Sequence, residues 1–203
     1  MPKPYTHFSR KEFSQRQKKT RKHLQELGLD GLLLFKIEDM YWLTGYESDG
    51  FCIFGSMFIG TDGALTHLAR PADLGNLSYS SICEDVRISP DTEDSTRAEH
   101  IKDMLRSLGM EGKKIGIQVD TMGLTPRLFL EIKEILDGWC NLAVAPDFIR
   151  VLRLVKSPQE LSYFRKAGEI MDIVMDKVIE VTYPGAFEGD IYATFYDTLF
   201  RLD

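Results

Sequence analysis

The feature that most constrains the fold is a short, continuous apolar run that directly follows an amphipathic helix. Residues 31–35 (GLLLF) contain no polar side chain and are bounded by turn-forming residues, which is typical of a strand buried on both faces. Before this run, Ser9 and Glu12 have the spacing of a capping box, and Gly28 marks the end of the helix that they open. A helix followed by an inner strand predicts an α/β fold.

The rest of the first 150 residues alternates between helical and strand patterns, with one hairpin. Asp62 and Gly63 form a turn between apolar runs at residues 51–60 and 64–69, which predicts two antiparallel strands. Further strands are expected over residues 85–88, 114–119 and 141–145, and helices over residues 71–82, 96–108 and 125–136. Parallel neighbours need a helical crossover, whereas the hairpin forces an antiparallel pair. The pattern therefore predicts a mixed sheet with helices on its faces.

A domain boundary is expected just before residue 157. Ser157 and Glu160 form a second capping box, with Pro158 in the first helical turn, where its missing N–H is tolerated. Apolar residues then recur at steps of three and four up to the Pro184–Gly185 pair, and a second helix is expected over residues 188–202. We expect one complete domain at residues 1–153 and the incomplete start of another at residues 154–203, because no strand follows to cover these helices.

Composition and charge exclude several classes of partner. The 203 residues carry a net charge of −6, which opposes binding to the phosphate backbone of nucleic acids. The N-terminus has no apolar leader, and no stretch approaches the roughly 20 apolar residues of a membrane span, so we expect a cytoplasmic protein without a membrane partner. Cys52, Cys83 and Cys140 are odd in number and far apart, which favours reduced thiols.

The histidines do not form a recognisable metal motif. A divalent cation needs several carboxylates or imidazoles that converge on one point. His7, His23, His67 and His100 occur singly, without a carboxylate at matching spacing. We therefore expect no metal site and no catalytic residue within these 203 residues.

Four stretches, in order along the chain, carry a family resemblance. They are residues 27–34 (LGLDGLLL) with 41–46 (YWLTGY), residues 113–117 (KKIGI) followed by Asp120, residues 152–161 (LRLVKSPQEL), and residues 170–190. Together they resemble the creatinase/prolidase family, which includes Xaa-Pro dipeptidases, aminopeptidase P and ectoine hydrolases. The resemblance implies a mixed, roughly six-stranded sheet of ribonuclease-H-like type. Two helices that begin a truncated pita-bread catalytic domain would follow.

The resemblance also implies a function for the parent protein. In this family two divalent metal ions, commonly manganese, cobalt or zinc, are held by two Asp, one His and two Glu of the pita-bread domain, and no position here matches them. The parent would hydrolyse a C–N bond in a small peptide or a cyclic amidine with a metal-activated water. This chain, inactive alone, would support a homodimer and shape the partner subunit's active site. The alternative is a free-standing module that dimerises or binds a partner without hydrolase activity.

The resemblance places residues 46–56 near the partner subunit's active site. In creatinase itself an aromatic residue, followed two positions later by an arginine, grips the substrate carboxylate. The matching residues here are Phe54 and Ser56, so the arginine is absent, which argues against creatine as substrate. The candidate substrate-binding residues are Tyr46, Asp49, Phe54 and Arg70. For each of them, packing or a surface ion pair is the simpler interpretation.

Overall fold

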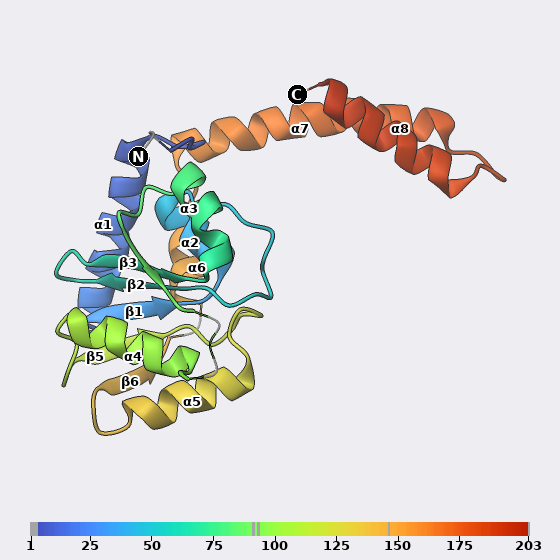
Figure 1. Ribbon diagram of the computed structural model, residues 1–203. Coiled ribbons are helices and arrows are strands. Elements are labelled where there is room, and N and C mark those ends of the chain that lie inside the picture. The colour runs from blue at the N-terminus through green and yellow to red at the C-terminus, as the bar shows by residue number, and fades with distance from the viewer. Residues whose placement is uncertain (1–3, 91, 93, 146, 203) are drawn as a thin grey trace. The chain divides into compact units, whose positions relative to one another are not determined.

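The first of two compact units is built on a six-stranded sheet. The computed structural model describes residues 4–90, 92, 94–145 and 147–202, and the chain divides into units Met1–Leu154 and Val155–Asp203. In the first unit the strands are β1 (Gly31–Leu34), β2 (Ser56–Gly60), β3 (Leu65–Ala69), β4 (Asp85–Ile88), β5 (Lys114–Ile117) and β6 (Asn141–Val144), in the order β4-β3-β2-β1-β5-β6 (Figure 1).

The sheet is mixed, as the sequence predicts. β2 lies between β1 and β3 and is antiparallel to both, whereas β1 with β5, β5 with β6, and β3 with β4 are parallel pairs. On the central strand, Leu33 is in register with Phe58 on one side and Ile117 on the other. The predicted hairpin is confirmed, but β2 begins at Ser56 and not at Phe51, because residues 45–55 form a loop.

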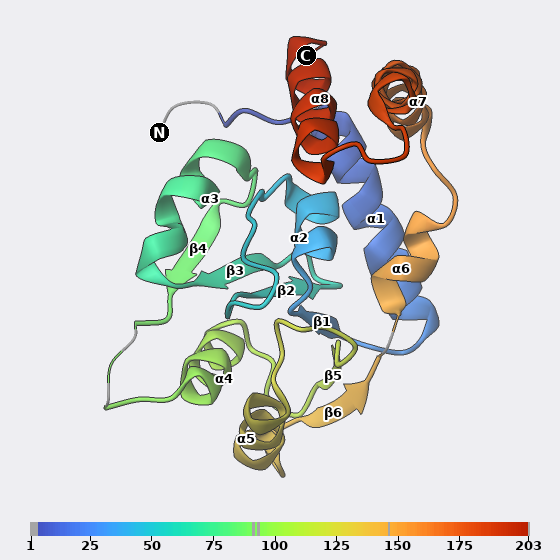
Figure 2. The same ribbon diagram turned by 90° about the vertical axis from the view of Figure 1, so that its right-hand side faces the viewer.

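Helices cover both faces of this sheet (Figure 2). They are α1 (Arg10–Glu26), α2 (Ile37–Thr44), a short 3₁₀ turn (Pro71–Asp73) with α3 (Leu74–Ser80), α4 (Arg97–Ser107), α5 (Pro126–Leu136) and α6 (Phe148–Arg153). α4 and α5 lie on one side, and α1, α2 and α6 lie on the other. We call these the α4/α5 face and the α1/α2/α6 face.

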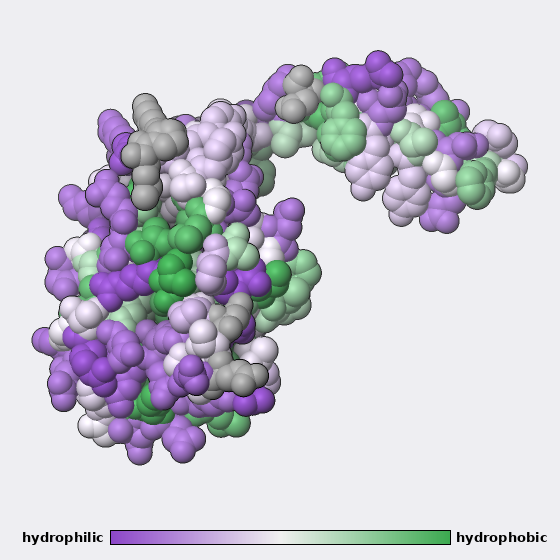
Figure 3. All heavy atoms as spheres, viewed as in Figure 1, coloured by the Kyte–Doolittle hydropathy of each residue, from purple (hydrophilic) through white to green (hydrophobic). Residues whose placement is uncertain are grey.

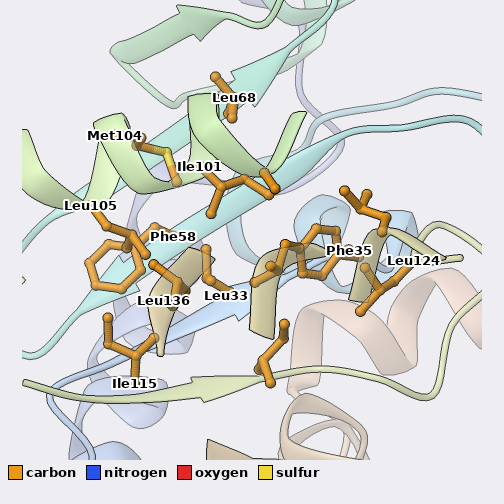
Figure 4. Close-up of a cluster of buried hydrophobic side chains, with 14 of the residues drawn as sticks. Leu33, Phe35, Phe58, Leu68, Ile101, Met104, Leu105, Ile115, Leu124 and Leu136 are labelled. Atoms are coloured by element: carbon orange, nitrogen blue, oxygen red, sulfur yellow. The ribbon is translucent and has the colours of Figure 1, made fainter. Parts of the chain in front are cut away.

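Each face has its own apolar core, because successive strand residues point to opposite sides. Leu33 and Phe58 contribute to the α4/α5 core, whereas Leu32 and Met57 contribute to the α1/α2/α6 core. Figure 4 shows the first of these, where Leu33, Phe35, Phe58, Leu68 and Ile115 of the sheet region meet Ile101, Met104, Leu105 and Leu136 of the two helices. The prediction of a central strand buried on both faces is confirmed by the four buried residues of β1.

Two short helices have no counterpart among the predicted elements. α2 is eight residues long and begins after Lys36 without a side-chain cap, so it lacks the usual start pattern. α6 follows Asp147, whose φ of 55° is uncommon for a residue other than glycine. Both helices are held by tertiary packing, since Met40 and Leu43 of α2 and Ile149 of α6 are buried in the same core.

The second unit consists of two helices, α7 (Pro158–Val181) and α8 (Glu188–Arg201). The predicted capping box is present, because the Ser157 hydroxyl accepts from the Glu160 amide while the Glu160 carboxylate accepts from the Ser157 amide. Val174 is the one described residue of these two helices that is buried. Apolar side chains gather at the surface of this unit (Figure 3), among them Phe164, Ile179 and Phe200, each more than 60% exposed.

Within the described ranges, no helix has both the length and the apolar character that crossing a lipid bilayer requires.

Candidate functional site

Three of the four predicted site residues line one small pocket beneath loop 45–55. Tyr46, Phe54 and Arg70 border a cavity of ≈ 20 Å³, whereas Asp49 is exposed and does not border it. One water needs roughly 10–15 Å³ of such space, and small-molecule sites usually offer about 300–1,000 Å³. The pocket therefore has room for a water-sized group and is too small for a dipeptide or a cyclic amidine.

Tyr46 is placed by the end of α2. Gly45 ends that helix in the left-handed conformation, with φ of 80°, and the Thr44 hydroxyl then accepts a hydrogen bond from the Tyr46 amide. The Tyr46 ring is 5% exposed and meets His67 edge to face, with 4.7 Å between ring centroids. Burial raises the pKa of the Tyr46 hydroxyl, against a smaller opposing effect of its hydrogen bond with Ser48, so the phenol is neutral near pH 7.

Phe54 belongs to the apolar core of the α4/α5 face. Its ring is 4% exposed, and the Arg97 guanidinium carbon lies 4.7 Å from the ring centroid in a cation–π contact. Tyr46 lies in the core of the opposite face. Both aromatic rings are thus packing residues in this structure, and a role for either in substrate binding stays a prediction.

Arg70 is held by an ion pair. Its Nε and Nη2 atoms donate to the two carboxylate oxygens of Asp73 at 3.0 and 2.9 Å, and the two side chains are 22% and 13% exposed. A bidentate pair of this kind fixes the guanidinium at the end of β3. A substrate carboxylate that approached Arg70 would have to compete with Asp73.

His67 is the residue at this site that sequence reasoning missed. It lies on β3, opposite Met57 of β2, and is fully buried. Burial lowers the pKa of His67 to about 4, and the Asp73 carboxylate opposes this shift. The apolar run that contains His67 could have indicated a buried position, because β3 is buried on both sides, but it could not reveal the contact with Tyr46.

The metal set that the family resemblance implies does not fit the described residues of this chain. His7 hydrogen-bonds Tyr41, His23 hydrogen-bonds Glu26, and His100 lies between two serine hydroxyls, so each is engaged in a different part of the first unit. Across residues 4–90, 92, 94–145 and 147–202, no three His, Cys, Asp or Glu side chains converge where a metal could bind.

The surface beside the pocket is hollowed and partly apolar. Residues of loop 45–55 border two cavities of ≈ 300 and ≈ 530 Å³, which are also lined by residues that follow β5. Cys52 and Phe54 border the first cavity, and Phe51 and Met122 border the second. Phe51 is 54% exposed and Met122 is 70% exposed. In open α/β sheets this edge is the usual place for ligands and contacts.

Known proteins resemble this chain over most of its length. Residues 16–155 match the creatinase/prolidase N-terminal domain. The chain is 27% identical over 199 residues to an uncharacterised hydrolase/peptidase of Sinorhizobium fredii, covering 94% of the chain and 50% of that protein. It is 24% identical over 196 residues to the ectoine hydrolase of Halomonas elongata, covering 93% of the chain and 49% of that protein.

Solved structures share the fold. The Xaa-Pro dipeptidase from Bacillus anthracis superposes with a TM-score of 0.75 at 17% identity, over 93% of this chain and 49% of that one. The prolidase from Thermococcus sibiricus gives 0.74 at 22% identity, over 92% and 49%. The chain spans about half the length of these relatives. Because the family match takes in well over half of the 203 residues, the chain belongs to the creatinase/prolidase N-terminal domain family.

Proposed function

We propose that this chain is the non-catalytic N-terminal part of a metal-dependent hydrolase that cleaves a C–N bond in a small peptide or a cyclic amidine. Relatives named as hydrolases and dipeptidases are about twice as long as the chain, which supports a parent with a further catalytic part. Two divalent ions, manganese, cobalt or zinc, would be held by that further part. The described residues of this chain would supply none of the ligands.

We also propose that the chain contains one complete domain and the start of a second. Residues 1–153 form the N-terminal domain, and residues 154–203 form the start of the pita-bread domain. Support comes from the exposed apolar side chains of α7 and α8, such as Phe164 and Phe200. A helix that displays such a face normally packs it against another layer, at about 25 cal/mol for each Å² removed from water.

The proposed role of the first unit is to form a homodimer and to wall the partner subunit's active site. The observation that carries it is the apolar surface at the end of β1 and β5, where Phe51 and Met122 border one cavity and are 54% and 70% exposed. Exposed apolar groups that cluster at one edge mark interaction surfaces. Tyr46, Asp49, Phe54 and Arg70 are carried by the same loop or border it, so they would lie near the substrate as its outer wall.

Activity of the full-length parent tests the substrate class. The manganese-loaded protein is assayed for hydrolysis of Ala-Pro, ectoine and creatine. We expect turnover of Ala-Pro or ectoine and none of creatine, because the arginine that grips creatine is replaced by Ser56. A metal-loaded parent that hydrolyses none of the three would overturn the substrate class and favour a dimerising or partner-binding module.

A charged substitution in the apolar surface tests whether the parent protein dimerises through loop 45–55. Phe51→Asp in the full-length parent should shift the species seen by light scattering from dimer to monomer, and activity should fall with it. The matched control is Leu130→Asp, which changes a different exposed apolar residue, 62% exposed, on α5. If Phe51→Asp stays dimeric, or if both variants dissociate alike, loop 45–55 does not form the interface.

A further inference from the structure

The adjacent parallel strands β1 and β5 lead to opposite faces of the sheet. β1 continues into α2, whose Met40 and Leu43 lie in the α1/α2/α6 core, and β5 continues into α5, whose Ile132 lies in the α4/α5 core (Figure 2). Where neighbouring parallel strands part in this way, their continuations diverge beyond the carboxyl ends and leave a crevice, which is the usual ligand site of an open α/β sheet. The fold therefore predicts a crevice between residues 35–38 and residues 118–124.

A cavity of ≈ 530 Å³ lies at this point. Lys36 and Glu38, which follow β1, border it on one side, and Asp120 and Met122, which follow β5, border it on the other. Phe51 of loop 45–55 adds an apolar wall. Small-molecule sites in proteins usually measure about 300–1,000 Å³. The cavity is therefore large enough for a ligand of the size of an amino acid or a dipeptide.

A buried side chain fixes the backbone on which this cavity is built. Oε1 of Gln118, a residue that is 2% exposed, accepts from the amides of Phe35 and Lys36 at 3.2 and 3.0 Å. Its Nε2 donates to Asp39 at 2.6 Å. The loop after β5 also approaches β1 closely, because a methyl group added to Gly123 would lie 2.3 Å from the Phe35 carbonyl oxygen. Both walls are thus held in place before a ligand binds, which lowers the entropic cost of binding.

Charges of both signs border the cavity. Lys36 supplies an ammonium group, and Glu38 and Asp120 supply carboxylates. Among the residues that the structure describes, none of these three side chains forms an ion pair or a hydrogen bond. Asp147 and Arg150, on which Lys36 and Asp120 act electrostatically, already pair with each other, with 2.6 Å between Oδ1 and Nε. The cavity therefore offers one cation and two anions to a ligand.

A small zwitterion with an apolar side chain matches these groups. Its ammonium group would pair with Glu38 or Asp120, and its carboxylate would pair with Lys36. Its apolar part would cover Phe51 and Met122, which are 54% and 70% exposed. A ligand with charge of one sign would meet like charge on part of the wall, which disfavours its binding.

We propose that the cavity between the ends of β1 and β5 binds a small zwitterion with an apolar side chain, the chemistry that a free amino acid and a dipeptide share. The site goes beyond the proposed function, because all of its groups belong to this chain and none depends on a further catalytic part.

Titration of the 203-residue chain with leucine and with the dipeptide Leu-Leu tests the proposal. The readouts are the amide resonances of residues 36–38 and 119–124 in ¹H–¹⁵N NMR and the dissociation constant from calorimetry. We expect saturable shifts of these amides with at least one of the two ligands, and the tighter ligand identifies the source of the zwitterion. If neither ligand shifts these amides, the proposal is wrong. Shifts that follow protein concentration and not ligand concentration would assign the surface to contacts between copies, and would also overturn it.

Removing one ligand charge at a time tests the recognition without any change to the protein. The N-acetylated form of the bound ligand lacks the ammonium group, and the C-terminally amidated form lacks the carboxylate. We expect each to bind at least several-fold more weakly than the zwitterion. Equal binding of all three forms would show that the charges of the cavity do not contribute, and would contradict a zwitterion site.

A variant then assigns the carboxylate contact to one side chain. Lys36→Gln should weaken binding of the zwitterion several-fold and leave binding of the amidated form unchanged, because that form has no carboxylate to lose a partner. The matched control is Lys113→Gln, which removes an exposed ammonium group that does not border the cavity and should bind every form as the wild type does. If Lys36→Gln weakens the zwitterion and the amidated form alike, Lys36 does not hold the carboxylate, and the proposed orientation of the ligand is wrong.

Discussion

The two faces of the sheet in the first unit bury different kinds of side chain. The α4/α5 core consists of apolar side chains, and the buried polar residues on that side, such as Ser56 and Thr66, carry hydroxyl groups. The α1/α2/α6 face instead buries charged or titratable groups, including Glu12, Arg16 and Asp39. The α4/α5 face buries no charged side chain in its core, whereas the α1/α2/α6 face does.

The polar face is organised around two networks. Arg16 donates to the Glu12 carboxylate at 3.1 Å and to the Trp42 carbonyl at 3.0 Å, which joins α1 to α2. Asp39 accepts from Gln118 at 2.6 Å and from Arg153 at 2.7 Å, which joins α2 to the end of β5 and to the end of α6. The difference indicates that the α1/α2/α6 face fixes the direction of several chain segments, while the α4/α5 face supplies apolar burial.

The largest expected effect is the loss of packing on the apolar face. Ile132→Ala removes a fully buried side chain of α5 and should lower the free energy of unfolding by about 4 kcal/mol. Leu130→Ala, on the exposed side of the same helix, should change it by less than about 0.5 kcal/mol. Denaturant titration followed by tryptophan fluorescence reports this unit, because Trp42 and Trp139 both lie in it. Equal effects of the two substitutions would contradict the assigned core.

The next largest effect is a pH dependence that belongs to the polar face. His67 has a pKa of about 4 in the folded protein, below its ordinary value of 6.5, because burial disfavours the charged ring, while Asp73 acts in the opposite sense. Between these values the unfolded chain binds the extra proton. The contribution of the neutral His67 ring to the free energy of unfolding is therefore complete above pH 6.5. It falls by about 3 kcal/mol as the pH drops to 4.

Comparison with His67→Phe isolates this contribution, since the carboxylates that titrate in the same range remain in both proteins. The wild type should lose more stability than His67→Phe between pH 6.5 and pH 4, as measured by unfolding in denaturant at each pH. Parallel pH profiles for the two proteins would show that His67 keeps an ordinary pKa in the folded state.

A smaller effect is expected from the network that joins three segments on the polar face. Asp39→Ala removes the acceptor of both Gln118 and Arg153. Because Asp39 is 1% exposed but Arg153 is 35% exposed, we expect a loss of about 2 kcal/mol, below the usual range for a fully buried pair. Asp103→Ala, which breaks an exposed pair with Arg106, should change stability by less than about 1 kcal/mol. A similar small loss from both would mean that the Asp39 network adds nothing beyond a surface pair.

The elements of the first unit differ in how well the sequence predicted them. The strand at residues 31–35 and the helices over residues 96–108 and 125–136 follow from local apolar periodicity and caps, and the structure confirms them. On the polar face, α2 escaped prediction because it is short, lacks a side-chain cap, and is stabilised by residues distant in sequence. Apolar periodicity indicates which face of a helix or strand is buried, but not which distant residues that face contacts.

The candidate site shows the same limit. A surface ion pair was one interpretation of Arg70, and the structure pairs its guanidinium with Asp73. The burial of Phe54 depends on α4 and α5, whose residues follow it by more than 40 positions. The contact of Tyr46 with His67 depends on the register of β3 against β2. These are properties of the assembled sheet, so a single sequence could name the residues without placing them.

The smallest predicted effect concerns a local interaction on the apolar face. The Thr96 hydroxyl accepts from the Glu99 amide, and the Glu99 carboxylate accepts from the Thr96 amide, so the two residues cap α4 reciprocally. Thr96→Ala should lower the free energy of unfolding by about 1 kcal/mol, because one amide at the helix start loses its partner. Thr96→Ser keeps the hydroxyl and should stay within a few tenths of the wild type. If serine and alanine prove equally destabilising, the loss comes from the threonine methyl group, and the apolar face is held even here by packing and not by the cap.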